Sequence, residues 1–309
     1  MKSIQNRVCL ASLALAVFFL GAAASAPVAP LTFKSPEEAV RALAEIAESG
    51  DRARADKLFG GDSAELLNSG DEVADKQDAE KVLKMIKEKV AFDDAAGGRK
   101  VALFGNDAWP FPIPLIPDGG LWRFDAAAGK EELLNRRIGR NELLTIETLH
   151  GYVDAQREYF AQGRDGTPPA YAQKFRSGEG RHDGLFWPTV QGEPESPLGE
   201  LAARASAEGY LRDKDPEPDP YHGYYFRMLT AQGKAAAGGK KSYLDAKGLM
   251  TGGFAAIAWP ALYGKGGVMT FIVDQQGTIL QKDLGAETGK TVQSITAYDP
   301  DETWKPVGD

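Results

Sequence analysis

The segment from Glu131 to Gln281 constrains the fold of this chain more strongly than any other segment. It opens with a long amphipathic stretch ending in DAQREYF and continues with aromatic-rich runs separated by glycines, YHGYYFRMLT, GGFAAIAW and VMTFIVDQQGTIL. From Lys130 onward apolar residues recur with the period of a helix, whereas the later runs alternate with the period of two that a strand requires. This order predicts a long helix packed on an antiparallel sheet.

The predicted helix has about eight turns at ~3.6 residues per turn. Its apolar stripe comprises Leu134, Ile138, Ile146, Leu149, Val153, Gln156 and Phe160. Gly139 and Gly151 are expected to weaken the helix locally, each by roughly 1 kcal/mol relative to alanine, or to allow close packing there. In the sheet, Asp274-Gln275-Gln276-Gly277 is typical of a hairpin turn, which pairs the residues of 268–273 with those of 278–282.

The first part of the chain is expected to form helices and a small sheet. Ser35-Pro36-Glu37-Glu38 is typical of a helix start, because its serine can cap, its proline suits the first helical position and its last glutamate can reach back. A further helix and two strands are expected at Asp78–Val90, Val101–Phe104 and Leu121–Phe124. The proline-rich run 109–115 is expected at an exposed edge or in irregular structure, because prolines cannot donate to a central ladder.

Together these patterns predict an α+β protein with two units. The first, residues 31–128, contains helices and a small sheet, and the second, residues 130–309, contains the long helix and the antiparallel sheet. The composition, 43% hydrophobic and 26% charged, is that of a soluble globular protein. The formal net charge of -8 argues against nucleic acid or anionic lipid as a partner.

The N-terminus has the pattern of an export signal. Lys2 and Arg7 precede an apolar run from Leu10 to Leu20, and small residues follow it. We expect a signal peptide over residues 1–24, with Ser25 as the new N-terminus and a periplasmic or secreted protein as the product. An uncleaved anchor is the alternative, although the run is shorter than the ~20 residues that span a bilayer. The single cysteine, Cys9, lies in this segment, so the mature chain is expected to contain neither thiol nor disulfide.

Several phrases resemble the bacterial domain-of-unknown-function family 2950. They include SPEEAV, WPFPIPL, YVDAQREY, RHDGLFWP, PYHGYYFRMLTAQG and GVMTFIVDQQGTILQKDLG, and they occur in order along nearly the whole expected mature chain. This resemblance implies no reaction, because the family has no established catalytic or binding residues to carry over.

Part of the chain is also similar to the globular part of type IV pilins and pseudopilins. The similarity is carried by NELLTIETLHGYVDAQREYF followed by GYYFRMLT, GGFAAIAWP and TFIVDQQGTI, and it implies one helix laid across an antiparallel sheet. The chain lacks the N-terminal apolar helix, with its cleavage-site glycine and glutamate, by which pilins polymerise. A pilus-associated accessory subunit is therefore one possible role. The first unit distantly resembles domains of the nuclear-transport-factor-2 kind.

An enzymatic alternative starts from three blocks that resemble those of the GDS-type esterases. These are Gly61-Asp62-Ser63, Gly105-Asn106-Asp107 and Asp219-Pro220-Tyr221-His222. In that hypothesis Ser63 is the nucleophile, Asn106 donates to the oxyanion, and Asp219 orients His222 as the base, which requires His222 within hydrogen-bond reach of Ser63. The polar, helical context before Ser63 argues against it, because such a serine follows a buried strand.

Metal and cofactor sites are not predicted. His182-Asp183, His222, Asp125 and Asp219 carry donor atoms for a metal, but no pair has the i, i+4 spacing of a recognisable site. The segment 285–291 resembles a phosphate loop but is one residue short and follows no buried strand.

Aromatic residues are the remaining candidates for binding, because tryptophan and tyrosine combine an apolar face with a polar tip. Most of the large aromatic residues are expected in the core, and the candidates for lining a groove for a peptide or glycan are Trp109, Phe111, Trp187, Tyr221 and His222. The sequence therefore favours a non-catalytic binding or interaction protein of the envelope, whose partner is an envelope protein or a glycan and which has no membrane span after signal cleavage. The esterase is the alternative.

Overall fold

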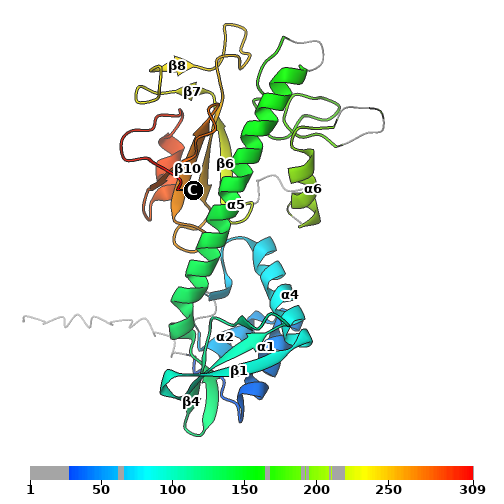
Figure 1. Cartoon of the computed structure of the whole chain (residues 1–309), viewed down its shortest axis with the longest axis vertical. Helices are drawn as coiled ribbons and strands as arrows, with labels where there is room; N and C mark the ends of the chain where they lie inside the picture. The colour runs from blue at the N-terminus through cyan, green and yellow to red at the C-terminus, as the bar shows by residue number, and fades with distance from the viewer. Residues whose placement is uncertain are drawn as a thin grey trace, which may run out of the picture.

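One helix, α5 (Ala126–Gln162), connects two units of the molecule (Figure 1). The computed structural model describes residues 28–61, 66–163, 168–188, 192, 195–208, 210 and 220–308. Figure 1 shows the N-terminal unit around the first part of α5 and the C-terminal sheet beside its last part. The fold is α+β, as predicted. Among the helices of these residues, none is long and apolar enough to cross a membrane.

In the N-terminal unit, the helices that the structure describes in full pack on an antiparallel sheet. The helices are α1 (Pro36–Ser49), α2 (Arg52–Phe59) and α4 (Glu72–Glu88). The strands are β1 (Val90–Ala95), β2 (Arg99–Phe104), β3 (Trp109–Pro110), β4 (Leu115–Asp118) and β5 (Leu121–Phe124), in the order β1-β2-β4-β5, with β3 also paired to β2. The core of this unit includes Ala39, Leu43, Leu58, Phe104, Leu115 and Phe124.

Local sequence signals explain where the helices of this unit begin. Ser35 caps α1 by accepting from the Glu38 amide at 3.3 Å, and Pro36 is its first residue, as predicted. Helix α4 begins six residues before the predicted Asp78, because Asp71 caps it by accepting from the Ala74 amide at 2.9 Å. The predicted end at Val90 was wrong, since that residue opens β1.

The C-terminal unit is built on a five-stranded antiparallel sheet. Its strands are β6 (Tyr224–Leu229), β9 (Ala255–Pro260), β10 (Met269–Asp274), β11 (Leu280–Asp283) and β12 (Lys305–Pro306), in the order β12-β11-β10-β9-β6. Around it lie α6 (Gly199–Ala207), α7 (Thr288–Thr291), a 3-10 turn (Val292–Ser294) and a small ribbon of β7 (Ala231–Gln232) and β8 (Lys241–Ser242). The predicted hairpin is confirmed: Phe271 pairs with Gln281, and Gly277 has a φ of +86° in the turn.

The last part of α5 lies on this sheet, as the apolar pattern predicted. Leu149, Tyr152 and Val153 are buried in one core with Ile257 and Phe271 of β9 and β10. The Tyr152 hydroxyl donates to the carbonyl of Ala255, the first residue of β9, at 3.0 Å. Burial raises the pKa of Tyr152 far above its usual value, so it stays a neutral donor.

The first part of α5 belongs to the N-terminal unit instead. The helix begins at Ala126 and not at Lys130, because Asp125 caps it through the Ala128 amide at 3.3 Å. A Cβ on Gly129 would lie 2.6 Å from the Ile113 side chain, so this glycine lets α5 approach the proline-rich segment. The predicted boundary between the units, at residues 128–130, therefore falls inside one continuous helix. In this first part of α5 the apolar stripe is only half-buried, at Leu134 and Ile138.

Candidate functional site

Two of the predicted binding residues are core residues. Phe111 is 7% exposed, and its ring contacts those of Phe104 and Phe124 at 5.2 and 5.9 Å. Trp187 is 3% exposed and packs against the His182 ring at 4.5 Å. Because neither ring has a free face, the prediction that both line an exposed groove was wrong.

Trp109 is half-buried, but its ring is engaged by a side chain of α5. The Arg136 guanidinium lies 5.5 Å from the centre of the ring and donates to the Pro110 carbonyl at 3.0 Å. This cation–π contact ties β3 to α5. Trp109 thus joins two elements of the N-terminal unit.

The structure does not bring together the esterase residues that it describes. Asn106 is exposed in the turn after β2, where the neighbouring Gly105 amide donates to the Met85 carbonyl at 3.0 Å, near the end of α4. His222 lies at the start of α4, beside Asp71. The helix has 17 residues, so its ends are about 25 Å apart at ~1.5 Å per residue. Ser63 and Asp219 lie outside the described residues.

The residues weighed as metal ligands have other contacts. Asp125 caps α5, and Asp183 accepts from Lys174 at 2.6 Å and from the Gly178 amide at 2.9 Å. Within the described part of the chain, no group of three or more histidine, cysteine, aspartate or glutamate residues is placed to hold a metal ion.

Tyr221 and His222 lie where the two units meet, among three further polar residues. We call Asp71, Glu208, Tyr210, Tyr221 and His222 the junction cluster. Asp71 is 2% exposed and belongs to the N-terminal unit. One of its carboxylate oxygens caps α4, and the other accepts from the Tyr210 hydroxyl and from the Gly223 amide, both at 2.8 Å. A single buried carboxylate therefore holds two segments of the C-terminal unit.

His222 is fixed by a tight turn that precedes β6. Tyr221 and Tyr224 exchange backbone hydrogen bonds at 2.9 and 3.1 Å, and His222 and Gly223 between them have φ values of +49° and +77°. Positive φ at both central residues is the geometry of a type I′ turn. A Cβ on Gly223 would lie 2.8 Å from the side-chain amide of Asn141, so α5 approaches the turn closely. A histidine in this conformation is uncommon and indicates a constrained position.

The His222 ring is enclosed by groups from the segment after α6 and from its own turn. Its Nε2 lies 3.2 Å from Glu208 Oε2, its Nδ1 lies 3.5 Å from the Tyr210 hydroxyl, and its side chain is 12% exposed. The Tyr221 ring packs on it at 4.2 Å. Burial lowers the pKa of His222, against the opposing attraction of Glu208 and Asp71. Burial likewise raises the pKa of Tyr221 to about 12, with Glu208 adding to the effect.

Further contacts bind the start of α4 to the second unit and to α5. The Gln77 side chain donates to the Glu208 carbonyl at 2.7 Å. Arg140 of α5 donates to both carboxylate oxygens of Asp78, each at 2.7 Å. Bidentate pairs of this kind fix orientation as well as distance. The units are therefore held in one arrangement by directional bonds.

The loop of residues 261–268, which we call the junction loop, packs on the same place. A Cβ on Gly70 would lie 2.6 Å from the Leu262 side chain, so this leucine covers the loop before α4. The Asn141 amide donates to the Gly266 carbonyl at 2.9 Å, and Glu142 accepts from the amides of Val268 and Met269 at 2.9 and 3.0 Å. Two neighbouring residues of α5 thus anchor the loop.

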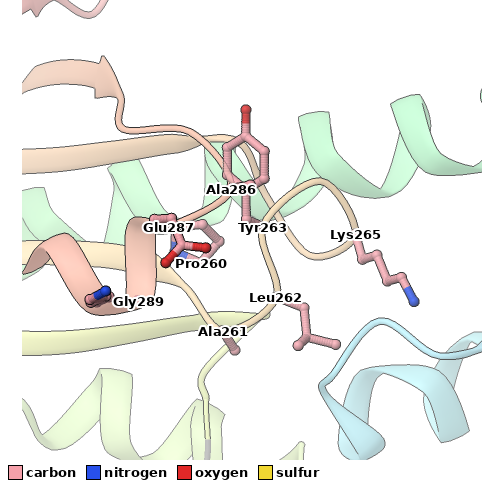
Figure 2. A pocket seen from close by; sticks show the side chains of 9 residues that line it. Pro260, Ala261, Leu262, Tyr263, Lys265, Ala286, Glu287 and Gly289 are labelled. Atoms are coloured by element: carbon pink, nitrogen blue, oxygen red, sulfur yellow. The ribbon is translucent and has the colours of Figure 1, made fainter.

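A surface hollow flanks the junction loop on each side. The first, of about 400 Å³, lies between the loop and residues 286–290, and its lining includes Pro260, Leu262, Tyr263 and Glu287 (Figure 2). The second, of about 320 Å³, lies between the loop and α5, and its lining includes Leu134, Ile138 and Val268. In Figure 2 Glu287 lies beside Pro260, whereas Lys265 points away from them. Both linings combine apolar side chains with charged ones, such as Glu287 in the first hollow and Lys130 in the second.

Comparison with known proteins assigns the chain to a family. The sequence profile described as protein of unknown function (DUF2950) matches residues 31–307. The chain belongs to this family. The match covers both units and α5, so the junction lies inside the region that defines DUF2950. No curated protein and no solved structure matches the chain. The resemblance to pilins is thus not confirmed by these comparisons.

Sequence reasoning on this DUF2950 protein missed three members of the junction cluster. Asp71 could have been predicted as a helix cap, because an aspartate just before a stretch of amphipathic helical pattern is a candidate N-cap. Glu208 and Tyr210 had no such sequence signal, since they follow α6 in a polar stretch and acquire partners only through the tertiary fold. His222 was singled out for other reasons, as the base of the esterase hypothesis, as a possible metal donor and as a candidate groove residue.

Proposed function

We propose that this DUF2950 protein is an exported, non-catalytic interaction protein of the bacterial envelope that holds a partner protein at the junction loop. The observation that carries the proposal is the pair of hollows on either side of this loop, with Leu262, at 39% exposure, lining the first of them. Exposed apolar surface beside shaped hollows is typical of protein-binding sites.

Two properties of the surface around the loop support binding, its rigid backbone and its balance of charges. Its backbone is anchored by Asn141 and Glu142, so little conformational freedom remains to be lost when a partner docks. Two lysines, Lys265 and Lys290, and the single carboxylate of Glu287 line the first hollow, and the Lys265 side chain points away from Glu287. This balance favours a partner that presents an apolar side chain next to an acidic group.

The binding proposal is tested with a photo-reactive residue in place of Leu262. We expect it to cross-link one partner protein in the envelope fraction, and we expect Leu262→Ser to weaken binding of that purified partner at least tenfold. Leu121, a leucine of β5 with 37% exposure, is the matched control. Equal cross-linking from both positions, or equal affinity of Leu262→Ser and Leu121→Ser, would contradict the proposal.

Export is tested separately from binding. The basic residues and apolar run of the first 24 residues support cleavage by a signal peptidase. We expect the protein in the periplasmic or secreted fraction with Ser25 as its first residue, measured by fractionation and N-terminal sequencing. A full-length chain in the membrane fraction would instead support a retained anchor.

A further inference from the structure

We propose that the free edge of β1 is a second binding site, which takes an extended basic segment of another protein as an added antiparallel strand. In the strand order β1-β2-β4-β5, β1 lies at one end, and among the described residues it pairs only with β2. The opposite end of the sheet is covered, because Phe33 and Trp122 of β5 exchange backbone hydrogen bonds at 2.8 and 2.7 Å. This edge is separate from the junction loop, so the inference goes beyond the proposed function.

The pairing of β1 with β2 shows which backbone groups of β1 face outward. Just before β1, the Gly105 amide donates to the Lys89 carbonyl at 3.0 Å, so these two residues form a hydrogen-bonded pair. Such pairs alternate along an antiparallel ladder with pairs that exchange no hydrogen bond. Val90, Phe92 and Asp94 fall at the alternate positions, so their amides and carbonyls point away from β2.

A contact on the far side of β2 gives the same alternation. Ala102 is the residue of β2 opposite Phe92, and its carbonyl accepts from the Phe111 amide at 2.8 Å, on the side away from β1. Ala102 therefore does not bond to Phe92. Within the described part of the chain, no hydrogen bond reaches the outward amides of Phe92 and Asp94. These groups are free to bind a further strand.

The strand lacks the features that commonly protect a sheet edge from another chain. Its six residues contain neither proline nor lysine, and they pair with β2 without a bulge from Val90 to Ala95. At ~3.3 Å per residue the edge is about 20 Å long. Half-buried Phe92 packs against the core of the N-terminal unit, which holds the strand in place. An ordered, straight edge of this length is a template for an added strand.

The charge of the edge selects the kind of partner. Asp93 and Asp94 are both exposed, and no ion pair within the described residues involves Asp93. Asp94 binds Lys100 at 2.7 Å, but its side chain remains 87% exposed, so a second cation can reach it. A basic segment complements these carboxylates. A second copy of β1 would instead bring further carboxylates to the same edge, which is unfavourable.

The positions of the side chains specify the order of residues in the partner. Asp93 and Asp94 lie in the second half of β1, whereas Val90 and Phe92 lie in the first half. An antiparallel strand runs the other way, so it meets the two aspartates first and the apolar residues afterwards. The peptide TKKVTV has this order, with lysines opposite the aspartates and valines opposite Phe92 and Val90.

The proposal is tested by adding the capped peptide TKKVTV to the expected mature chain and following amide hydrogen exchange by nuclear magnetic resonance. Without peptide, we expect rapid exchange at Phe92 and Asp94 and slow exchange at Ala91 and Asp93, whose amides face β2. Saturating peptide is expected to slow exchange at Phe92 and Asp94 at least tenfold and to leave the other two unchanged. The control peptide TEEVTV is expected to bind at least tenfold more weakly.

Asp94→Pro tests the backbone contact, because proline removes the outward amide at a position where an edge strand tolerates it. We expect this variant to bind TKKVTV at least tenfold more weakly. Unchanged slow exchange at Ala91 and Asp93 shows that its pairing with β2 is intact.

Asp94→Asn tests the charge separately, because asparagine keeps the backbone amide. We expect it to reduce the preference for TKKVTV over TEEVTV several-fold. Asp107→Asn, at an exposed position after β2, is the matched control and is expected to keep the full preference.

Three results would overturn the proposal: unchanged exchange at Phe92 and Asp94 with saturating peptide, equal binding of the two peptides, or equal binding by Asp94→Pro. A dimer of the unaltered protein in sedimentation, abolished by Asp94→Pro and without protection by peptide, would assign the edge to a second copy and also overturn it. The cross-link from Leu262 does not involve β1, so each proposal can fail without the other.

Discussion

The hydroxyl of Tyr210 donates to the buried carboxylate of Asp71 at 2.8 Å, across 139 residues of sequence. The same carboxylate oxygen accepts from the Gly223 amide, and the other oxygen caps α4. Asp71 therefore starts a helix of one unit and fastens two segments of the other. This double use makes the junction sensitive to single substitutions.

Asp71→Ala is expected to lower the free energy of unfolding by about 2–4 kcal/mol, because it removes a helix cap and leaves buried donors unsatisfied. Asp51→Ala is the matched control, since Asp51 also caps a helix, by accepting from the Arg54 amide at 3.0 Å, but at the exposed surface. The control is expected to cost about 1 kcal/mol. Urea unfolding followed by circular dichroism measures both, and equal costs would show that the contacts across the junction contribute nothing.

Gly223→Ala is expected to destabilise the protein more than Gly97→Ala does. Both glycines have positive φ, +77° and +76°, so both variants meet backbone strain of about 1 kcal/mol or more. Only at Gly223 would the added Cβ meet a neighbour, the Asn141 side-chain amide at 2.8 Å, whereas nothing lies within 4 Å at Gly97. We expect a difference of about 1–2 kcal/mol in thermal or urea unfolding. If the two variants unfold alike, α5 does not approach the turn as closely as the structure shows.

Alkaline pH is expected to destabilise the junction through Tyr221. Burial raises its pKa to about 12 from an ordinary value of 10.0, so its contribution to stability is complete below pH 10 and is lost as the pH rises through 12. Tyr221→Phe is expected to show a smaller loss of stability over this range. Tyr263→Phe, which removes an exposed hydrogen bond to Asp283 at 3.1 Å, is the comparison. Parallel pH profiles for Tyr221→Phe and the unaltered protein would refute this assignment.

Ser63→Ala is expected to leave any hydrolysis of p-nitrophenyl acetate by the mature protein unchanged. The reason is that Asn106 and His222 lie at opposite ends of α4, about 25 Å apart at ~1.5 Å per residue, too far to act on one oxyanion. His222→Asn is assayed in parallel. A matching loss of activity in both variants would instead support the esterase hypothesis.

Features that depend on neighbouring residues were predictable. The cap at Ser35, the hairpin around Gly277 and the burial of Leu149 and Val153 follow from capping, turn chemistry and periodicity, which act over a few residues. The sequence analysis placed the start of α5 four residues too late, at Lys130. The residues Ala126–Gly129 show no apolar periodicity, and the helix begins there because Asp125 caps it.

The sequence by itself determined the α+β class, the long helix and the hairpin of the second sheet, because local preferences and the apolar period specify each of them. The tertiary structure alone decided that Asp71 meets Tyr210 and Gly223, that Phe111 and Trp187 are core residues, and that the junction loop lies between two hollows. The physical reason is the separation in sequence between the residues that interact. A hydrogen bond between residues 152 positions apart, such as that from Gly223 to Asp71, exists only after both units have packed on α5 and brought its donor and acceptor together.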